Sequence, residues 1–132
     1  MRCLIVEDDK ISSQVLEKMM SRHGRSTTVA DGQRAVDMFQ QAHESKSPYE
    51  LILMDIMIPE IDGLQSVQTI REKEAGMKIP SNQRVRIIMT TALDDPRTIM
   101  KALYESNADS FLVKPIRLQK LEDELRELKL IP

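Results

Sequence analysis

The chain has 132 residues, 19 basic and 21 acidic, with a formal net charge of −2 and a single cysteine. This length predicts one domain, residues 1–132, that buries about two-thirds of its unfolded surface without disulfides or a structural metal. The balanced charge, without a basic block, argues against direct nucleic-acid binding. No apolar stretch is long enough to span a membrane and no leader precedes the first apolar run, so we expect neither membrane insertion nor export.

Five short apolar runs alternate with five amphipathic segments. The runs predict strands near 2–6, 26–30, 51–55, 85–90 and 110–113. The other segments predict helices near 10–22, 33–43, 63–75, 96–106 and 117–129. This alternation is typical of right-handed βαβ units and predicts a parallel α/β sheet. The second strand is the least apolar and is expected at an edge of that sheet.

Apolar residues recur at helical spacing in the predicted helices and indicate a stripe that faces the core. In the first helix this stripe comprises Ile11, Val15, Leu16, Met19 and Met20. The single cysteine, Cys3, lies in the first apolar run without a partner cysteine or histidine nearby, which predicts a buried structural thiol.

Turn and cap residues support these boundaries. Asp9 is expected to cap the first helix, and Asp62-Gly63 predicts a turn into the third. Residues 75–84, between the third helix and the fourth strand, exceed the usual length of such a loop. They are expected to form a mobile excursion or a partner contact.

Charged and polar residues end four of the apolar runs. They are Glu7 and Asp8 after the first run, Asp55 at the end of the third, Thr91 at the end of the fourth and Lys114 after the fifth. In open α/β sheets, ligands bind outside the carboxyl ends of the strands. If the first strand lies between the second and third, these side chains predict one shared site for a cation and a phosphoryl group.

The residue types suit phosphoryl transfer. Carboxylates on strands about 4.8 Å apart repel by roughly 3 kcal/mol at an effective dielectric of about 20, which a divalent cation would relieve. Oxygen ligands suit Mg²⁺, with Mn²⁺ as an alternative. Asp55 can act as a nucleophile on phosphorus, while Lys114 and Thr91 hold phosphoryl oxygens. Each residue alone could be a cap, a strand residue or a solvated charge, but their coincidence favours function.

The same residues carry a resemblance to a known family. The segments concerned are Glu7-Asp8-Asp9, Asp55-Ile56-Met57-Ile58-Pro59 with Asp62-Gly63, Thr91-Ala92 and Lys114-Pro115. They resemble the signature of CheY-like response-regulator receiver domains, and the resemblance extends over essentially the whole chain. It implies a doubly wound five-stranded parallel sheet of order 2-1-3-4-5, the flavodoxin-like (βα)5 fold.

The resemblance also implies a phosphoacceptor and a metal site. Asp55 matches the aspartate that receives the phosphoryl group. Glu7 and Asp8 match the acidic pair at the metal, and the backbone carbonyl of Met57 matches a further Mg²⁺ ligand. We also expect the apolar Met57 and Leu93, which flank the site in the sequence, to slow loss of phosphate.

A switch is implied as well. Thr91 matches the switch hydroxyl, Phe111 the switch aromatic and Lys114 the phosphate-binding lysine. The peptide bond between Lys114 and Pro115 is expected to be cis. The chain departs from the family pattern at 75–84 and at 93–95, which bears on the output surface rather than on the chemistry.

The resemblance implies a cytoplasmic two-component response regulator. Asp55 would accept phosphoryl from a phosphohistidine of a histidine kinase or histidine phosphotransfer protein, with Mg²⁺ required. The face formed by the fourth helix, fifth strand and fifth helix would then bind a downstream effector protein, as a monomer or a phosphorylation-dependent dimer. Such a protein is a switch rather than an enzyme, although it takes part in its own phosphoryl transfer and hydrolysis. A stand-alone protein is expected, but an excised receiver would look the same.

Three other functions compete. An interaction module that is never phosphorylated would not need the complete set of acids with Thr91 and Lys114. A Mg²⁺-dependent phosphohydrolase would want a second acid near Asp55, where Met57 stands. A flavin carrier would want a hydroxyl- and glycine-rich loop after the first strand, where this chain has acidic residues.

Overall fold

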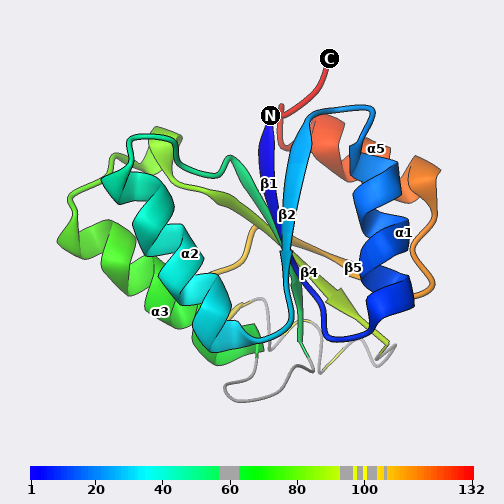
Figure 1. Cartoon of the computed structure of the whole chain (residues 1–132), viewed down its shortest axis with the longest axis horizontal. Coiled ribbons are helices and arrows are strands. Elements are labelled where there is room, and N and C mark those ends of the chain that lie inside the picture. Colours follow the sequence, from blue (N-terminus) through cyan, green and yellow to red (C-terminus); the bar gives the residue numbers. More distant parts are fainter. Residues whose placement is uncertain (57–62, 93–96, 98–99, 101–103, 106) are drawn as a thin grey trace.

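The computed structural model describes residues 1–56, 63–92, 97, 100, 104–105 and 107–132. Within these residues, five parallel strands form one sheet in the order β2-β1-β3-β4-β5 (Figure 1). The strands are β1 (Arg2–Val6), β2 (Arg25–Val29), β3 (Leu51–Asp55), β4 (Arg86–Thr91) and β5 (Ser110–Val113). The predicted flavodoxin-like order and the edge position of the polar second strand are therefore confirmed.

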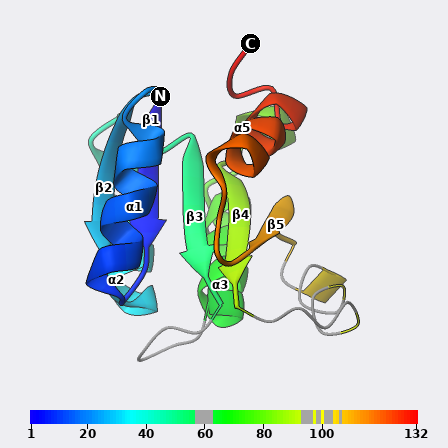
Figure 2. The ribbon, with the colours of Figure 1, turned by 90° about the vertical axis from the view of Figure 1, so that its right-hand side faces the viewer.

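Helices cover both faces of the sheet. They are α1 (Lys10–Met20), α2 (Gly32–Glu44), α3 (Gly63–Gly76) and α5 (Leu118–Glu127). Figures 1 and 2 show α1 and α5 on one face and α2 and α3 on the other. The helix predicted at 96–106 lies largely outside the described residues. None of the described helices is long and apolar enough to cross a membrane.

The core has two layers because successive side chains of a strand point to opposite faces. In β1, Cys3 and Ile5 join the cluster under α1 and α5, whereas Leu4 and Val6 join the cluster under α2 and α3. All four side chains are buried. The prediction that Cys3 is a buried structural thiol is confirmed.

The predicted core stripe of α1 is partly wrong. Leu16 and Met20 are buried against the sheet, but Ile11 is 72% exposed and Val15 is 46% exposed. Helical spacing places these two residues on one flank of α1, and that flank lines a cavity beside Lys114 instead of joining the core. The helix begins as predicted, because the Asp9 carboxylate accepts a hydrogen bond from the Ser12 amide at 3.0 Å.

The long segment after α3 is held by local hydrogen bonds, although most of its residues are exposed. The Ile79 amide donates to the Glu74 carbonyl at 3.0 Å, and a short 3₁₀ helix, η1 (Ser81–Gln83), follows. Arg84 then donates through Nε to the Ile79 carbonyl at 3.3 Å. These bonds give the segment a defined backbone path, and its role as a mobile excursion or a partner contact stays a prediction.

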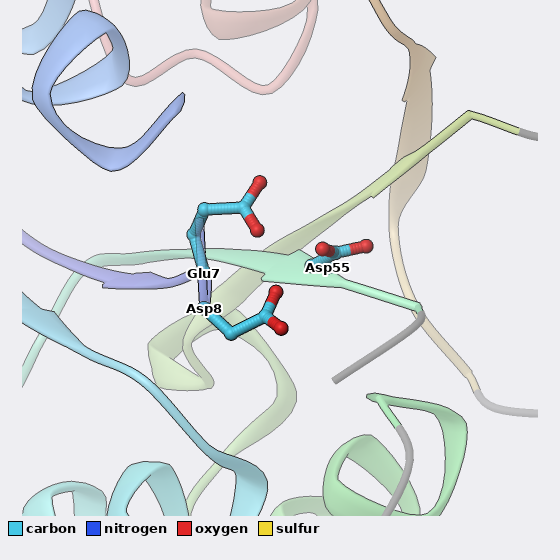
Figure 3. Close-up of side chains that lie close together, drawn as sticks. All are labelled: Glu7, Asp8 and Asp55. Atoms are coloured by element: carbon cyan, nitrogen blue, oxygen red, sulfur yellow. The ribbon is translucent and has the colours of Figure 1, made fainter. Parts of the chain in front are cut away.

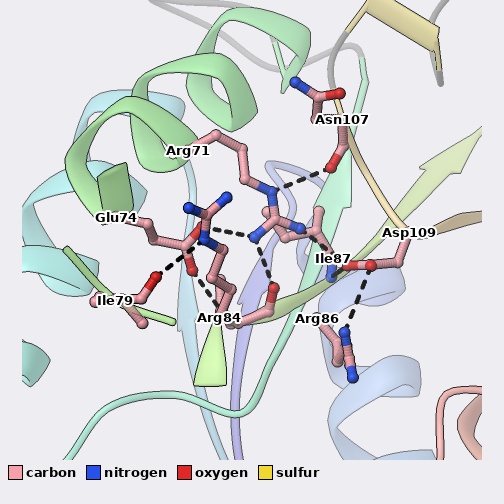
Figure 4. Close-up of polar contacts among 9 residues, drawn as sticks. Arg71, Glu74, Ile79, Arg84, Arg86, Ile87, Asn107 and Asp109 are labelled. Carbon is pink, nitrogen blue, oxygen red and sulfur yellow. Dashed lines mark hydrogen bonds and ion pairs between the residues drawn. The ribbon is translucent and has the colours of Figure 1, made fainter. Parts of the chain in front are cut away.

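A polar network anchors this segment at the amino end of β4 (Figure 4). Arg71 donates to Glu74 at 2.7 Å, to the Val85 carbonyl at 2.8 Å and to Asp109 at 2.9 Å. The other oxygen of Glu74 accepts from the Val85 amide at 2.8 Å. Asp109 likewise accepts from the Ile87 amide at 2.8 Å. Each buried charge in this cluster has an opposite charge and further hydrogen bonds, which is what burial of charge requires.

Candidate functional site

Three carboxylates converge at the carboxyl end of the sheet (Figure 3). Glu7 and Asp8 directly follow β1, and Asp55 is the last residue of β3. One oxygen from each lies within 4.8 Å of the others. Glu7 and Asp55 are both 4% exposed, whereas Asp8 is exposed. The structure thus brings together the three acids that the sequence placed at strand ends.

Strand register explains this convergence. The β1–β3 ladder pairs Val6 with Met54, so the residues that follow, Glu7 and Asp55, emerge side by side. The Glu7 amide donates to the Val29 carbonyl of β2 at 3.0 Å, which fixes the backbone on the other side of β1. The expectation that the first strand lies between the second and third is confirmed.

Lys114 occupies the same site. Its Nζ donates to Glu7 Oε1 at 2.5 Å and to Asp55 Oδ2 at 3.1 Å. The Lys114 amide donates to the Thr91 carbonyl at 2.7 Å, and the Lys114–Pro115 peptide bond is cis. One ammonium group therefore bridges the two buried carboxylates.

Burial and neighbouring charges shift the pKa values of Glu7 and Lys114. Burial, followed by the neighbouring Asp55, raises the pKa of Glu7, and the hydrogen bond from Lys114 offsets only part of this effect. Burial lowers the pKa of Lys114, but its hydrogen bonds to Glu7 and Asp55 outweigh that loss and raise the pKa overall. Among the described residues, three carboxylates and one ammonium group meet in the site, so negative charge is in excess there.

Of the remaining predicted site residues, the structure describes Thr91 and Phe111. Thr91 is buried at the end of β4, where its carbonyl accepts from the Lys114 amide. Phe111 lies on β5 in register with Met89 and packs against the cluster under α2 and α3. Met57, predicted to supply a carbonyl ligand, lies outside the described residues, as does Leu93.

Two features beside the site were not found from sequence. The first is Gly63, which was interpreted as a turn residue but packs against the backbone of Asp55. The second is a cavity of about 410 Å³ next to the site, lined by Glu7, Ile11, Ser12, Val15, Leu16, Lys114, Pro115 and Ile116. The sequence signal for Gly63 was the Asp62-Gly63 pair. The cavity was not predicted, because Ile11 and Val15 were expected in the core.

The donor set fits a hard divalent cation. Glu7, Asp8 and Asp55 offer oxygen atoms close enough to share one ion, and the exposure of Asp8 leaves room for water. Mg²⁺ is bound in proteins through one or two carboxylates together with water and phosphate oxygens. The residues present therefore suit Mg²⁺, and Mn²⁺ has the same ligand preference.

Comparisons with known proteins agree with this geometry. Residues 3–126 match the family model of the response regulator receiver domain. The chain is 33% identical over 128 residues to the osmosensing histidine protein kinase Sln1 of Saccharomyces cerevisiae, covering 96% of this chain but 10% of the kinase. The chain therefore spans a small part of that relative.

Two solved structures share the fold and part of the sequence. The receiver domain of the Pseudomonas aeruginosa sensor histidine kinase PA1611, with a magnesium ion in its active-site cleft, is 32% identical with a TM-score of 0.75, covering 96% of this chain and 94% of that one. The receiver domain of yeast Ssk1, solved with the histidine phosphotransfer protein Ypd1, is 28% identical with a TM-score of 0.80, covering 96% and 87%.

Proposed function

Because the chain belongs to the response regulator receiver family, we propose that it is a switch operated by phosphorylation of Asp55. One observation carries this proposal. The Asp55 carboxylate is 4% exposed, lies beside the oxygens of Glu7 and Asp8, and accepts from Lys114 Nζ at 3.1 Å. It is thus a nucleophile set among groups that hold cations and phosphate.

In the proposed reaction, an Asp55 carboxylate oxygen attacks the phosphorus of a phosphohistidine. The phosphorus–nitrogen bond breaks as the oxygen–phosphorus bond forms, and the departing imidazole takes a proton from water. Charge on the transferring group spreads over three equatorial oxygens, so positive charge and hydrogen-bond donors promote the step. Lys114 is positioned to supply an ammonium group, and we assign the Thr91 hydroxyl to a second oxygen.

Magnesium completes the proposed site. Glu7, Asp8 and Asp55 would hold it, together with the Met57 carbonyl, which lies outside the described residues. When bound, Mg²⁺ neutralises developing charge on phosphoryl oxygens and relieves the repulsion among the carboxylates. The donor set described above and the magnesium ion in the PA1611 receiver support this assignment.

The cavity beside Lys114 suits a protein phosphodonor. Ile11 and Val15 are exposed on one wall, and Pro115 and Ile116 form the other. Exposed apolar side chains grouped beside a reactive site are typical of protein contacts. We propose that a histidine kinase or histidine phosphotransfer protein docks here, in keeping with the partner named for the Ssk1 receiver.

The output is proposed to lie on the other flank of the sheet. New charge on Asp55 would reorder Thr91 and Phe111 and thereby change the face formed by the fourth predicted helix, β5 and α5. A downstream effector would bind that face, either to one chain or to a dimer. We propose that residues 1–132 act as one receiver domain in the cytoplasm.

Intact-mass spectrometry after incubation with acetyl phosphate and Mg²⁺ tests the proposal. The natural chain should gain one acid-stable, base-labile phosphoryl group, and chelation of Mg²⁺ should prevent the gain. Asp55→Asn should gain none, whereas Asp37→Asn, an exposed acid on α2, should behave like the natural chain. A folded natural chain that binds Mg²⁺ but gains no adduct would contradict the proposal and favour an interaction module.

A further inference from the structure

Gly63, the first residue of α3, lies directly against the end of β3. A Cβ atom at Gly63 would stand 2.2 Å from the Asp55 carbonyl oxygen and 2.9 Å from the Ile56 Cα. Real Cβ atoms essentially never approach other atoms closer than 3.0 Å. Gly63 is not among the described residues with positive φ, so space, and not backbone conformation, demands glycine here.

The atoms that such a Cβ would meet have little freedom to move away. Asp55 pairs with Thr90 in the β3–β4 ladder, and the Ile56 amide donates to the Thr90 carbonyl at 3.0 Å. The Gly63 amide in turn donates to the Ile56 carbonyl at 3.0 Å, so the start of α3 is tied to the same strand end. A side chain at Gly63 must therefore rotate the Asp55 peptide, displace the end of β3 or lift the helix.

We infer that Gly63 is a positioning residue for the phosphoacceptor. Because Gly63 has no side chain, α3 can begin directly against β3. This close packing keeps the Asp55 carboxylate directed toward Glu7 and Lys114. This inference rests on the proposed role of Asp55. An increase from 2.2 Å to an ordinary contact of 3.4 Å is a displacement of 1.2 Å, by subtraction of the two distances. Misplacement of a reacting group by about 1 Å lowers a rate by about 100-fold.

The test compares Gly63→Ala with Gly76→Ala. Gly76 ends the same helix, and a Cβ there would meet nothing within 4 Å. At saturating Mg²⁺, we expect Gly63→Ala to be phosphorylated by acetyl phosphate about 100-fold more slowly than the natural chain. We expect Gly76→Ala to stay within about twofold of it. Mg²⁺ affinity, followed by amide NMR shifts, should fall in Gly63→Ala alone.

A loss of folding must be separated from a loss of positioning. Circular dichroism gives the folded fraction of each variant, and an osmolyte such as trimethylamine N-oxide increases that fraction if Gly63→Ala is partly unfolded. Slow phosphorylation and weak Mg²⁺ binding within the folded fraction support the inference, and natural values of both overturn it. If even the natural chain takes no phosphoryl group, the proposed function fails, and Mg²⁺ affinity in the two variants still decides the role of Gly63.

Discussion

Lys114 is expected to compete with the cation that the site is proposed to bind. Its ammonium lies 2.5 Å from Glu7 Oε1 and 3.1 Å from Asp55 Oδ2, so it already neutralises part of the carboxylate charge. Lys114→Met keeps most of the apolar stem and removes that charge. We therefore expect this variant to bind Mg²⁺ more tightly, to lose stability in a chelator and to be phosphorylated more slowly.

The structure sets the size of these effects. Unit charges 3.1 Å apart interact by about 5 kcal/mol at an effective dielectric of about 20. The Lys114 side chain is 24% exposed, so solvent screens part of this energy. Removal of one partner lowers the free energy of unfolding by about 3–5 kcal/mol for a buried pair and by about 0–1 kcal/mol for an exposed one. For the partly exposed Lys114 we therefore expect Lys114→Met to lose about 2 kcal/mol of unfolding free energy. Relief of the competition should tighten Mg²⁺ binding by about tenfold, which corresponds to 1.4 kcal/mol.

Calorimetric titration with Mg²⁺ and urea denaturation with and without chelator measure both effects. Lys120→Met is the matched control, because Lys120 is exposed on α5 and the same charge is lost. Saturating Mg²⁺ should restore much of the stability that Lys114→Met loses in chelator. The reasoning is refuted if Lys114→Met binds Mg²⁺ no more tightly than Lys120→Met does.

Three further predictions concern stability and thiol chemistry. Burial and the adjacent carboxylate raise the pKa of Glu7 above 4.5 in the folded state. In the presence of a chelator, the natural chain should therefore lose stability as the pH rises through this raised pKa. Urea midpoints that fall equally in Glu7→Gln would contradict this. Burial raises the pKa of Cys3 to about 12, so a thiol-specific disulfide reagent at mildly alkaline pH should label Cys3 only in urea, and rapid native labelling would disprove it. Arg71→Met leaves the buried Glu74 carboxylate without its arginine partner and should lower the free energy of unfolding in urea by about 3–5 kcal/mol. Arg22→Met, at an exposed arginine, should lower it little. Equal losses in the two variants would exclude the network as the cause.

The sheet and the position of the site were predictable because each rests on a short-range pattern. Apolar runs near five to six residues long are typical of buried parallel strands, and the polar second run marked an edge. Parallel strands bring their carboxyl ends to one side of the sheet. Residues as distant as Glu7, Asp55 and Lys114 could therefore be assigned to one site before any contact was known.

Other features depend on packing that no local pattern contains. Helical spacing shows that Ile11 and Val15 share a flank of α1, but not whether that flank meets the sheet or the cavity beside Lys114. Strand ends placed Lys114 near the acids, yet the register and the β5–α5 connection decide that its ammonium reaches Glu7 as well as Asp55. Likewise, only the approach of α3 to β3 shows that Gly63 has no room for a side chain.

The two buried charge clusters differ in a way that separates structural from functional roles. At the amino end of β4, Arg71 meets both Glu74 and Asp109. The second oxygen of Glu74 accepts from the Val85 amide, and the second oxygen of Asp109 lies 3.9 Å from the Arg86 guanidinium. At the carboxyl end, one ammonium faces the buried Glu7 and Asp55, and exposed Asp8 adds further negative charge. The first cluster is electrostatically complete and holds elements together. Among the described residues, the second sets three carboxylates against one ammonium, an excess of negative charge that is in keeping with the proposed binding of a cation and a phosphoryl group.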